Sequence, residues 1–287
     1  MNRFFVTPED ARPDHVVFTG TNLHHLSRVL RLRPGDRVLA LTGDGQELEV
    51  ELEQVGPDQA VGTIVGRSLN LAEPPLALTL VQGLPKGDKM DLIIQKGTEL
   101  GVARVLPVST ERAVVRLEPG KAAQRQARWQ TIAREAAEQS RRGRVPLVSP
   151  VTALAGAIEE AERAVAERPG RVLALFPWEE ASDVGLADVL DPWRGAAGPK
   201  GGRSGMGTNR PDEVWVFVGP EGGFSPSEAD MARRAGILPI SLGPRILRTE
   251  TAGPAVAAMV LFALGDLGRA PRLPQTQVVP RPLQEQG

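Results

Sequence analysis

The chain has 287 residues, which allows one large domain or two ordinary ones with a substantial core. Hydrophobic residues make up 41% of it and charged residues 24%, and no apolar run approaches the roughly 18–20 residues that a membrane helix needs. The absence of cysteine excludes disulfides, thiolate metal sites and a cysteine nucleophile, and it fits a cytoplasmic location.

Positive charge is concentrated in parts of a chain whose net charge is only −1. Thirteen Lys and Arg stand against seven Asp and Glu between Leu84 and Pro146, and a shorter cluster contains Arg28, Arg31, Arg33 and Arg37. Local basic surface on a neutral protein is typical of a phosphate-binding face. Solvated helix faces would give the same counts, so charge alone leaves the two interpretations equal.

Residues 1–72 have the pattern of a small, mostly β domain. Gly43-Asp44-Gly45 separates two strand-like runs, Arg37–Thr42 and Gln46–Gln54, and Asp-Gly between such runs is a hairpin signal. A third strand is expected at Gln59–Gly66. Before these strands, Leu23, Leu26 and Leu30 share one face of a short helix that should end at Pro34-Gly35.

Residues 76–268 alternate between strands and helices, which predicts an α/β domain with a mainly parallel sheet. The expected strands are Leu76–Leu84, Arg104–Val108, Arg171–Phe176, Glu213–Val218 and Ile237–Leu242. The expected helices are Asp88–Leu100, Lys121–Arg142, Thr152–Glu167, one that begins at Ser225, and Pro254–Leu264.

Two segments lack the pattern of a folded element. Gly195–Pro211 holds six glycines and almost no large apolar residue, so we expect a flexible surface loop. Residues 269–287 carry four prolines and are expected to be a disordered tail.

Two glycine-bearing loops follow strands near the end of the chain. Gly219–Gly223 follows Val218, and Ser225-Pro226-Ser227-Glu228 then forms a capping box that starts a helix. A second loop, Gly243–Ala252, follows Leu242. Ligands of open α/β sheets sit at the carboxyl ends of strands, and backbone groups there suit an adenine or a ribose without repelling a sulfonium. Two tight strand–helix turns would be the structural alternative.

Several familiar catalytic signatures are missing. The chain has no dinucleotide fingerprint, phosphate-binding P-loop or zinc-protease motif, and its three histidines all lie in the N-terminal domain. This distribution of histidines argues against a Ser-His-Asp hydrolase. The helix Pro254–Leu264 is apolar on nearly every side, which predicts burial in the core or in a subunit interface.

These motifs together resemble a known family. Val218–Ser225 and Leu242–Thr251, with Lys86–Met90, Gln95–Gly101 and Glu138–Arg141, closely resemble the small-subunit ribosomal RNA uridine-N3 methyltransferases of the SPOUT class. The resemblance spans nearly the whole chain and includes Arg3-Phe4-Phe5, His25–Arg31, Glu111-Arg112, Arg144 and Pro146. The Gly195–Pro211 loop is longer than expected for the family.

The resemblance implies a trefoil-knotted α/β domain behind a small PUA-like β-barrel domain, a homodimer, S-adenosylmethionine as cofactor and small-subunit ribosomal RNA as substrate, with no metal. The cofactor-binding residues carried over from the family are Leu175, Phe176, Pro177, Gly219, Pro220, Glu221, Gly222, Gly223, Leu242, Gly243, Ile246, Leu247, Arg248, Thr249, Thr251 and Ala252. The RNA-binding residues are expected to be Arg3, Arg28, Arg31, Lys86, Lys89, Lys96, Arg112, Arg141 and Arg144.

Two residues are the catalytic candidates. Arg248 stays cationic and could stabilise negative charge on the uracil oxygens as N3 loses its proton. Glu250, or Glu221, could act as general base if burial raised its pKa. The simpler interpretation is that Glu250 favours a helix N-terminus and Glu221 holds its own loop, and we prefer it for both glutamates.

Two other functions stay open at this point. Another SPOUT methyltransferase would modify a ribose 2′-hydroxyl or a guanine N1 instead of a uracil N3. A non-catalytic ribosome-assembly protein would keep the RNA-binding module and lack cofactor binding, although the intact glycine loops argue against it.

Overall fold

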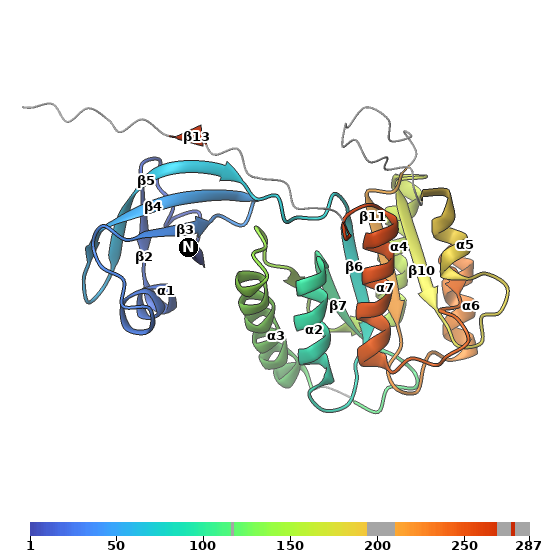
Figure 1. The fold of residues 1–287 in the computed structure, drawn as a ribbon. Coiled ribbons are helices and arrows are strands. Elements are labelled where there is room, and N and C mark those ends of the chain that lie inside the picture. The colour runs from blue at the N-terminus through green and yellow to red at the C-terminus, as the bar shows by residue number, and fades with distance from the viewer. Residues whose placement is uncertain (116–117, 194–209, 269–276, 279–287) are drawn as a thin grey trace, which may run out of the picture. The chain divides into compact units, whose positions relative to one another are not determined.

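The computed structural model describes residues 1–115, 118–193, 210–268 and 277–278. The chain forms two compact units (Figure 1). The first unit contains Met1–Glu73, Ala137–Val145 and Ala270–Gly287, and the second contains Pro74–Ala136 and Pro146–Arg269. The expected domain limits placed residues 137–145 in the second part of the chain. They belong with the first because Ala137 and Val145 pack against buried Phe5 and Leu41.

A six-stranded sheet forms the first unit. Its strands are β1 (Asn2–Phe5), β2 (His15–Phe18), β3 (Arg37–Leu41), β4 (Gln46–Val55), β5 (Ala60–Leu69) and β13 (Gln277–Val278). The order is β1-β3-β4-β5-β13 with β2 also paired to β5, and only the β1–β3 pairing is parallel. Alternate residues of these strands, such as Val38, Ala40, Leu48 and Val50, fill one core.

The short helix of the first unit differs from its prediction. It runs as α1 (Gly20–His24) and continues as a π-helical turn, η1 (His25–Val29), so it ends before Pro34. Leu23 and Leu26 are buried as expected, whereas Leu30 is only half-buried. The backbone N–H of Leu30 donates to the carbonyl of His25, and Arg31 then takes a positive φ of 55°, which stops the helix.

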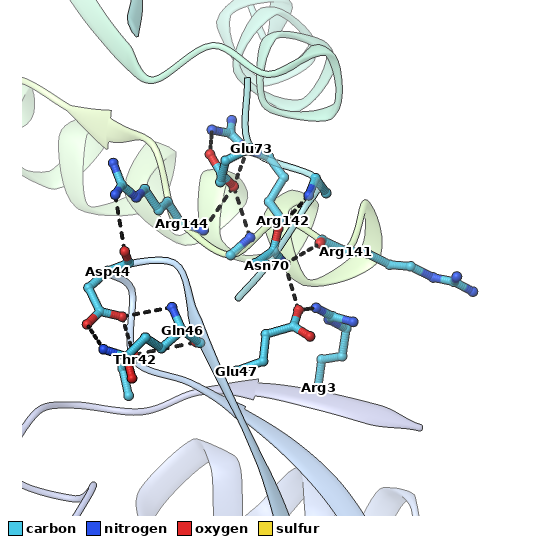
Figure 2. A network of polar contacts seen from close by, with 12 residues as sticks. Arg3, Thr42, Asp44, Gln46, Glu47, Asn70, Glu73, Arg141, Arg142 and Arg144 are labelled. Atoms are coloured by element: carbon cyan, nitrogen blue, oxygen red, sulfur yellow. Dashed lines mark hydrogen bonds and ion pairs between the residues drawn. The ribbon is translucent and has the colours of Figure 1, made fainter. Parts of the chain in front are cut away.

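A polar network holds residues 141–144 within the first unit (Figure 2). The Glu73 carboxylate accepts hydrogen bonds from the Arg142 side chain and from the backbone N–H groups of Gly143 and Arg144, at 2.8 to 3.3 Å. The Asn70 side-chain amide donates to Glu47 at 2.6 Å and to the carbonyl of Arg141 at 3.1 Å. These contacts join segments about 70 residues apart in the sequence.

A seven-stranded parallel sheet forms the second unit. Its strands are β6 (Ala77–Gly83), β7 (Arg104–Ser109), β8 (Leu147–Val148), β9 (Thr152–Ala153), β10 (Val172–Pro177), β11 (Glu213–Val218) and β12 (Leu238–Ile240). The order is β12-β10-β11-β6-β7-β8, with β9 also paired to β7. The predicted parallel sheet is confirmed, because every pairing in it is parallel.

Helices cover both faces of this sheet (Figure 1). They are α2 (Lys89–Leu100), α3 (Pro119–Gln139), α4 (Leu154–Glu167), α5 (Leu186–Leu190), α6 (Pro226–Arg234) and α7 (Thr249–Ala263), with a 3-10 turn, η2 (Asp191–Trp193). Helices α2 and α7 pack together, and α7 contacts β6 and β11. Helices α4 and α6 pack on the core that contains Phe176, Phe217 and Trp215.

Helix α7 begins earlier than predicted. The sequence predicts a start at Pro254, whereas α7 (Thr249–Ala263) starts five residues earlier and contains Pro254. Tertiary contacts override the proline signal, because the Thr249 hydroxyl is held by the carbonyl of Gly219 at 2.7 Å and by the Gln82 amide at 2.9 Å. The helix is also less evenly buried than expected, since Met259 and Phe262 are 39% and 61% exposed.

Of the predicted loop Gly195–Pro211 only Arg210 and Pro211 are described, and of the predicted tail only Gln277 and Val278, which form β13 rather than disordered chain. No described helix is long and apolar enough to cross a membrane. The same ranges contain no group of three or more histidine or acidic side chains arranged to hold a metal.

Candidate cofactor cavity and nucleic-acid surface

A cavity of about 530 Å³ lies in the second unit, beyond the carboxyl ends of β10, β11 and β12. Its volume falls within the range of small-molecule sites. Its lining comes from three strand ends with the loops that follow them and from the first residues of α2 and α7. It consists of Lys89, Pro177, Trp178, Glu179, Ala181, Val218–Glu221, Gly223, Phe224, Ser241–Thr249 and Ala252. The two glycine loops predicted to meet at this sheet edge therefore do so.

Two glycines, one in the loop after β11 and one at the end of β6, shape this loop. Gly223 has a φ of 65°, which favours glycine, and its N–H donates to the Pro220 carbonyl at 3.0 Å to close a tight turn. On the neighbouring strand, a Cβ at Gly83 would lie 2.5 Å from Pro220 Cδ. The loop therefore sits directly against the end of β6, with no space for a side chain between them.

The Gln82 side chain, at the end of β6, holds the loop after β11 in place. This side chain is fully buried, and its amide nitrogen donates to the Thr249 hydroxyl, with longer contacts to the carbonyls of Gly83 and Val218 at 3.0 and 3.4 Å. Thr249 in turn donates to the Gly219 carbonyl. A single buried amide thus connects the end of β6, the loop after β11 and the first turn of α7.

The predicted capping box at the start of α6 is confirmed. Ser225 Oγ accepts from the N–H of Glu228 at 3.2 Å, and the Glu228 carboxylate accepts from the N–H of Ser225 at 2.8 Å. The same carboxylate accepts from the N–H of Glu111 at 2.7 Å. Glu111 closes the cluster by accepting from Ser225 Oγ at 2.5 Å, so this cap also ties the loop after β7 to the cavity loop.

Lys89 pairs with both glutamates of the site. Its Nζ lies 2.9 Å from Glu221 Oε1 and 3.2 Å from Glu250 Oε2. Burial acts to raise the pKa of Glu221, but hydrogen bonds from Lys89 and from backbone N–H groups outweigh it and lower that pKa. The backbone N–H of Glu250, and then Lys89, lower the pKa of Glu250. Both carboxylates are thus ionised near neutral pH, and the stabilisation they give is lost only as the pH falls through their lowered pKa values.

Twelve of the sixteen predicted cofactor-binding residues line the cavity: Pro177, Gly219, Pro220, Glu221, Gly223, Leu242, Gly243, Ile246, Leu247, Arg248, Thr249 and Ala252. The four that do not are Leu175, Phe176, Gly222 and Thr251. Leu175 and Phe176 are fully buried within β10, and the lining begins at Pro177, the last residue of that strand. A Cβ at Gly222 would meet the Arg112 carbonyl at 3.0 Å, so this glycine faces the loop after β7.

The catalytic candidates separate in the structure. Arg248 caps α7 with an exposed side chain and lines the cavity. Glu250 lies in the first turn of α7, is absent from the lining and is paired with Lys89. Trp178 and Glu179 also line the cavity, although neither was predicted from the sequence. They directly follow Pro177, so the signal was the end of the strand itself.

The predicted RNA-binding cations occupy both units. In the first unit Arg28, Arg31, Arg141 and Arg144 are exposed, while Arg3 is half-buried and paired with Glu47. In the second unit Lys86 and Arg112 are exposed and Lys96 pairs with Glu99. Lys89 also lines the cavity, and its charge is paired with the two glutamates described above.

Arg141 holds an unfavourable backbone conformation at the end of α3. Its φ is 62°, which glycine adopts without cost and other residues adopt at a cost of about 1 kcal/mol. Burial, and then repulsion from Arg141, also lower the pKa of Arg3. Figure 2 shows the Arg141 side chain extended away from the network that holds its carbonyl. The sequence therefore places an exposed guanidinium where glycine would be more stable.

We expect Arg141→Gly to stabilise the first unit by about 1 kcal/mol, because it removes the backbone strain. Arg141→Ala removes the same guanidinium but keeps a Cβ at positive φ, so it is the matched control and should give no comparable gain. Hydrogen exchange of the β4 and β5 amides measures both. Equal stability of the two variants would contradict the strain at this position.

Two protein-family models match the chain in adjacent regions. The model described as an RNA methyltransferase domain matches residues 72–261. The model described as an RNA methyltransferase PUA domain matches residues 18–65, within the first unit.

Two curated relatives that align with most of this chain carry the same name. The protein from Bacillus subtilis named ribosomal RNA small subunit methyltransferase E is 34% identical over 82% of this chain and 84% of its own length. A protein of the same name from Mycobacterium tuberculosis is 32% identical over 90% of both chains.

Two solved structures of methyltransferases are similar to this chain over most of its length. The ribosomal RNA small subunit methyltransferase E from Neisseria gonorrhoeae, described as bound to S-adenosyl methionine, has a TM-score of 0.73 and 33% identity over 90% of this chain and 96% of its own. A methyltransferase from Legionella pneumophila, described as in complex with the same cofactor, has a TM-score of 0.71 and 31% identity over 91% and 96%.

The family match covers most of the second unit, including β6, β10, β11 and β12 and the cavity at their carboxyl ends. Together with the PUA match and relatives aligned along most of the chain, it shows that this protein belongs to the RNA methyltransferase family.

Proposed function

We propose that this chain transfers the methyl group of S-adenosylmethionine to N3 of a uridine in small-subunit ribosomal RNA, in the cytoplasm. The observation that carries the proposal is the cavity built from two glycine loops at the carboxyl ends of β11 and β12. Its setting in a chain whose relatives are named for ribosomal RNA methylation supports this choice of substrate.

The cavity residues fit S-adenosylmethionine. The backbone of Gly219–Glu221, Gly223 and Gly243 offers hydrogen-bonding groups without net charge, and Leu242, Leu247 and Ala252 offer apolar surface for an adenine. The wall also holds Trp178, whose buried indole nitrogen has no acceptor among the described residues. When bound, this cofactor supplies a methyl group already activated by its sulfonium.

The remaining task of the protein is to align the uracil and accept its change of charge. Alignment alone contributes up to about 7–11 kcal/mol in well-oriented reactions. N3 loses its proton to water, a C–N bond forms and the C–S bond breaks with its electron pair left on sulfur. Arg248 is exposed at the cavity and is positioned to stabilise charge on the uracil oxygens. The paired, ionised Glu221 and Glu250 keep Lys89 and the loops in place.

We further propose that exposed cations of both units contact RNA phosphates, with Arg28, Arg31, Arg141 and Arg144 in the first unit and Lys86 and Arg112 in the second. Each lost phosphate contact should reduce the salt slope of binding by about one unit. Arg141→Gly and Arg141→Ala should therefore lose RNA affinity equally, although only the first gains stability. Unchanged RNA affinity in both variants would show that Arg141 does not contact RNA.

Two aspects of the architecture complete the proposal. After β12 at the edge of the sheet, the chain returns across the loop after β11 to start α7 against β6 and β11, and this path supports a trefoil-knotted SPOUT domain. The exposed Met259 and Phe262 on α7 support a homodimer that covers them. An experimental chain trace tests the knot, and light scattering at micromolar concentration tests the dimer.

Mass spectrometry of nucleosides from small-subunit ribosomal RNA of cells with and without the gene tests the function. We expect N3-methyluridine to disappear without the gene and to return with the wild-type copy. Loss of a ribose-methylated nucleoside or of N1-methylguanosine would instead identify another specificity. Calorimetry separates out a non-catalytic assembly protein, which would not bind S-adenosylmethionine.

A further inference from the structure

Glu179 stands out among the charged residues of the cavity. It follows β10 by two positions, and its Oε1 lies 3.2 Å from the point where a Cβ at Gly223 would be. The carboxylate thus lies directly over the glycine turn that forms one wall of the cavity. Among the described residues, no ion pair or hydrogen bond to the Glu179 side chain is present, although the residue lines the cavity.

Apart from Glu179, the charged residues of the cavity lining carry a net positive charge. Lys89 and Glu221 pair with each other, and Arg245 and Arg248 are exposed cations of the loop before α7. The methyl donor has a positive sulfonium, a positive ammonium and one carboxylate, so its net charge is positive. Glu179 is therefore the unpaired anion in a lining that would otherwise repel this donor.

We propose that Glu179 recognises the positive charge of the methyl donor and so favours it over the product. Methyl transfer converts the sulfonium into a neutral thioether, so S-adenosylhomocysteine has no net charge while keeping the same adenosine and amino-acid groups. A carboxylate near the charge stabilises the donor more than the product. This specificity rests on the proposed function, because it assumes S-adenosylmethionine as donor.

Calorimetric titration of the full-length protein with both compounds tests the proposal. Glu179→Gln keeps the shape of the side chain and removes its charge. We expect it to weaken S-adenosylmethionine binding about fivefold and S-adenosylhomocysteine binding by less than about twofold, as for an ion pair in a partly exposed site. Sinefungin, which has a protonated amine in place of the sulfonium, should behave like the donor. Glu180→Gln is the matched control, since Glu180 is exposed and outside the lining.

The outcomes separate this inference from the proposed function. Equal losses for donor and product would show that Glu179 contacts a group common to both, such as the ribose, and would overturn recognition of charge. Unchanged binding of both compounds would overturn any role of Glu179 in the cavity. Failure of the wild-type protein to bind S-adenosylmethionine would instead refute the proposed function. Raising the salt concentration should reduce the wild-type preference for the donor, whereas in Glu179→Gln it should screen the remaining cations and cause no such reduction.

Discussion

Arg248→Ala is expected to lower the rate of methyl transfer by ~10²-fold or more, the scale of losing one donor to a developing oxyanion. Arg248 precedes the first residue of α7, is exposed and lines the cavity, and its guanidinium stays cationic at any working pH. The measurement is a single-turnover reaction with saturating RNA and cofactor, which isolates the chemical step from binding and release.

Matched variants show whether the loss is specific. Arg234→Ala removes an exposed guanidinium from α6, outside the cavity lining, and should leave the rate unchanged. Glu221→Gln and Glu250→Gln should lower the rate less than Arg248→Ala, because their lowered pKa values and their pairing with Lys89 make them poor bases. A near-normal rate for Arg248→Ala would move the role to another residue.

The pH dependence follows from the same pKa directions. Since both glutamates are ionised well below neutral pH, neither should produce a titration step in the rate between about pH 6 and 8. The wild-type rate should instead rise with pH as the uracil imide ionises. A rate that rises and then becomes constant near pH 6 to 7 would indicate a general base that titrates there.

Arg142→Ala is expected to destabilise the first unit by about 3–5 kcal/mol, the cost of breaking a buried ion pair. Arg142 is 3% exposed, and its Nη2 lies 2.8 Å from Glu73 Oε2. Glu73, whose side chain is 17% exposed, also accepts from the N–H groups of Gly143 and Arg144 (Figure 2). The substitution therefore removes the guanidinium that pairs with this mostly enclosed carboxylate.

The two units need separate probes. All four tryptophans, Trp129, Trp178, Trp193 and Trp215, belong to the second unit, so their fluorescence does not report the first. Hydrogen exchange of the β4 and β5 amides reports the first unit directly. We expect faster exchange there in Arg142→Ala. The control Arg37→Ala removes an exposed arginine that pairs with Glu49 and Glu51 in the same unit, and its loss should be far smaller. Equal losses would show that burial gives Arg142 no special role.

The place of the cavity was predictable from the sequence, but some of the residues that line it were not. The strand ends and glycine loops were predicted, because strand periodicity and turn residues are properties of neighbouring positions. Leu175 and Phe176, which were predicted to bind the cofactor, are fully buried in β10 and lie outside the cavity lining, whereas Trp178 and Glu179 line it without having been predicted. Which residue of a strand end reaches the edge depends on the register with neighbouring strands, and one sequence does not contain that information.

Local signals along the chain determined much of this protein. The capping box at Ser225, the end of α2 at Leu100 and the turn at Gly43-Asp44-Gly45 all formed where predicted, because each depends on residues within a few positions. Only the tertiary structure decided the start of α7, the pairing of Lys89 and the membership of residues 137–145 in the first unit. Lys89 and Glu221 are 132 positions apart, and such contacts form only when the whole chain has folded. Free energy from burial and charge pairing between distant segments then overrides local preference, which is why Pro254 lies inside a helix and Arg141 has a positive φ.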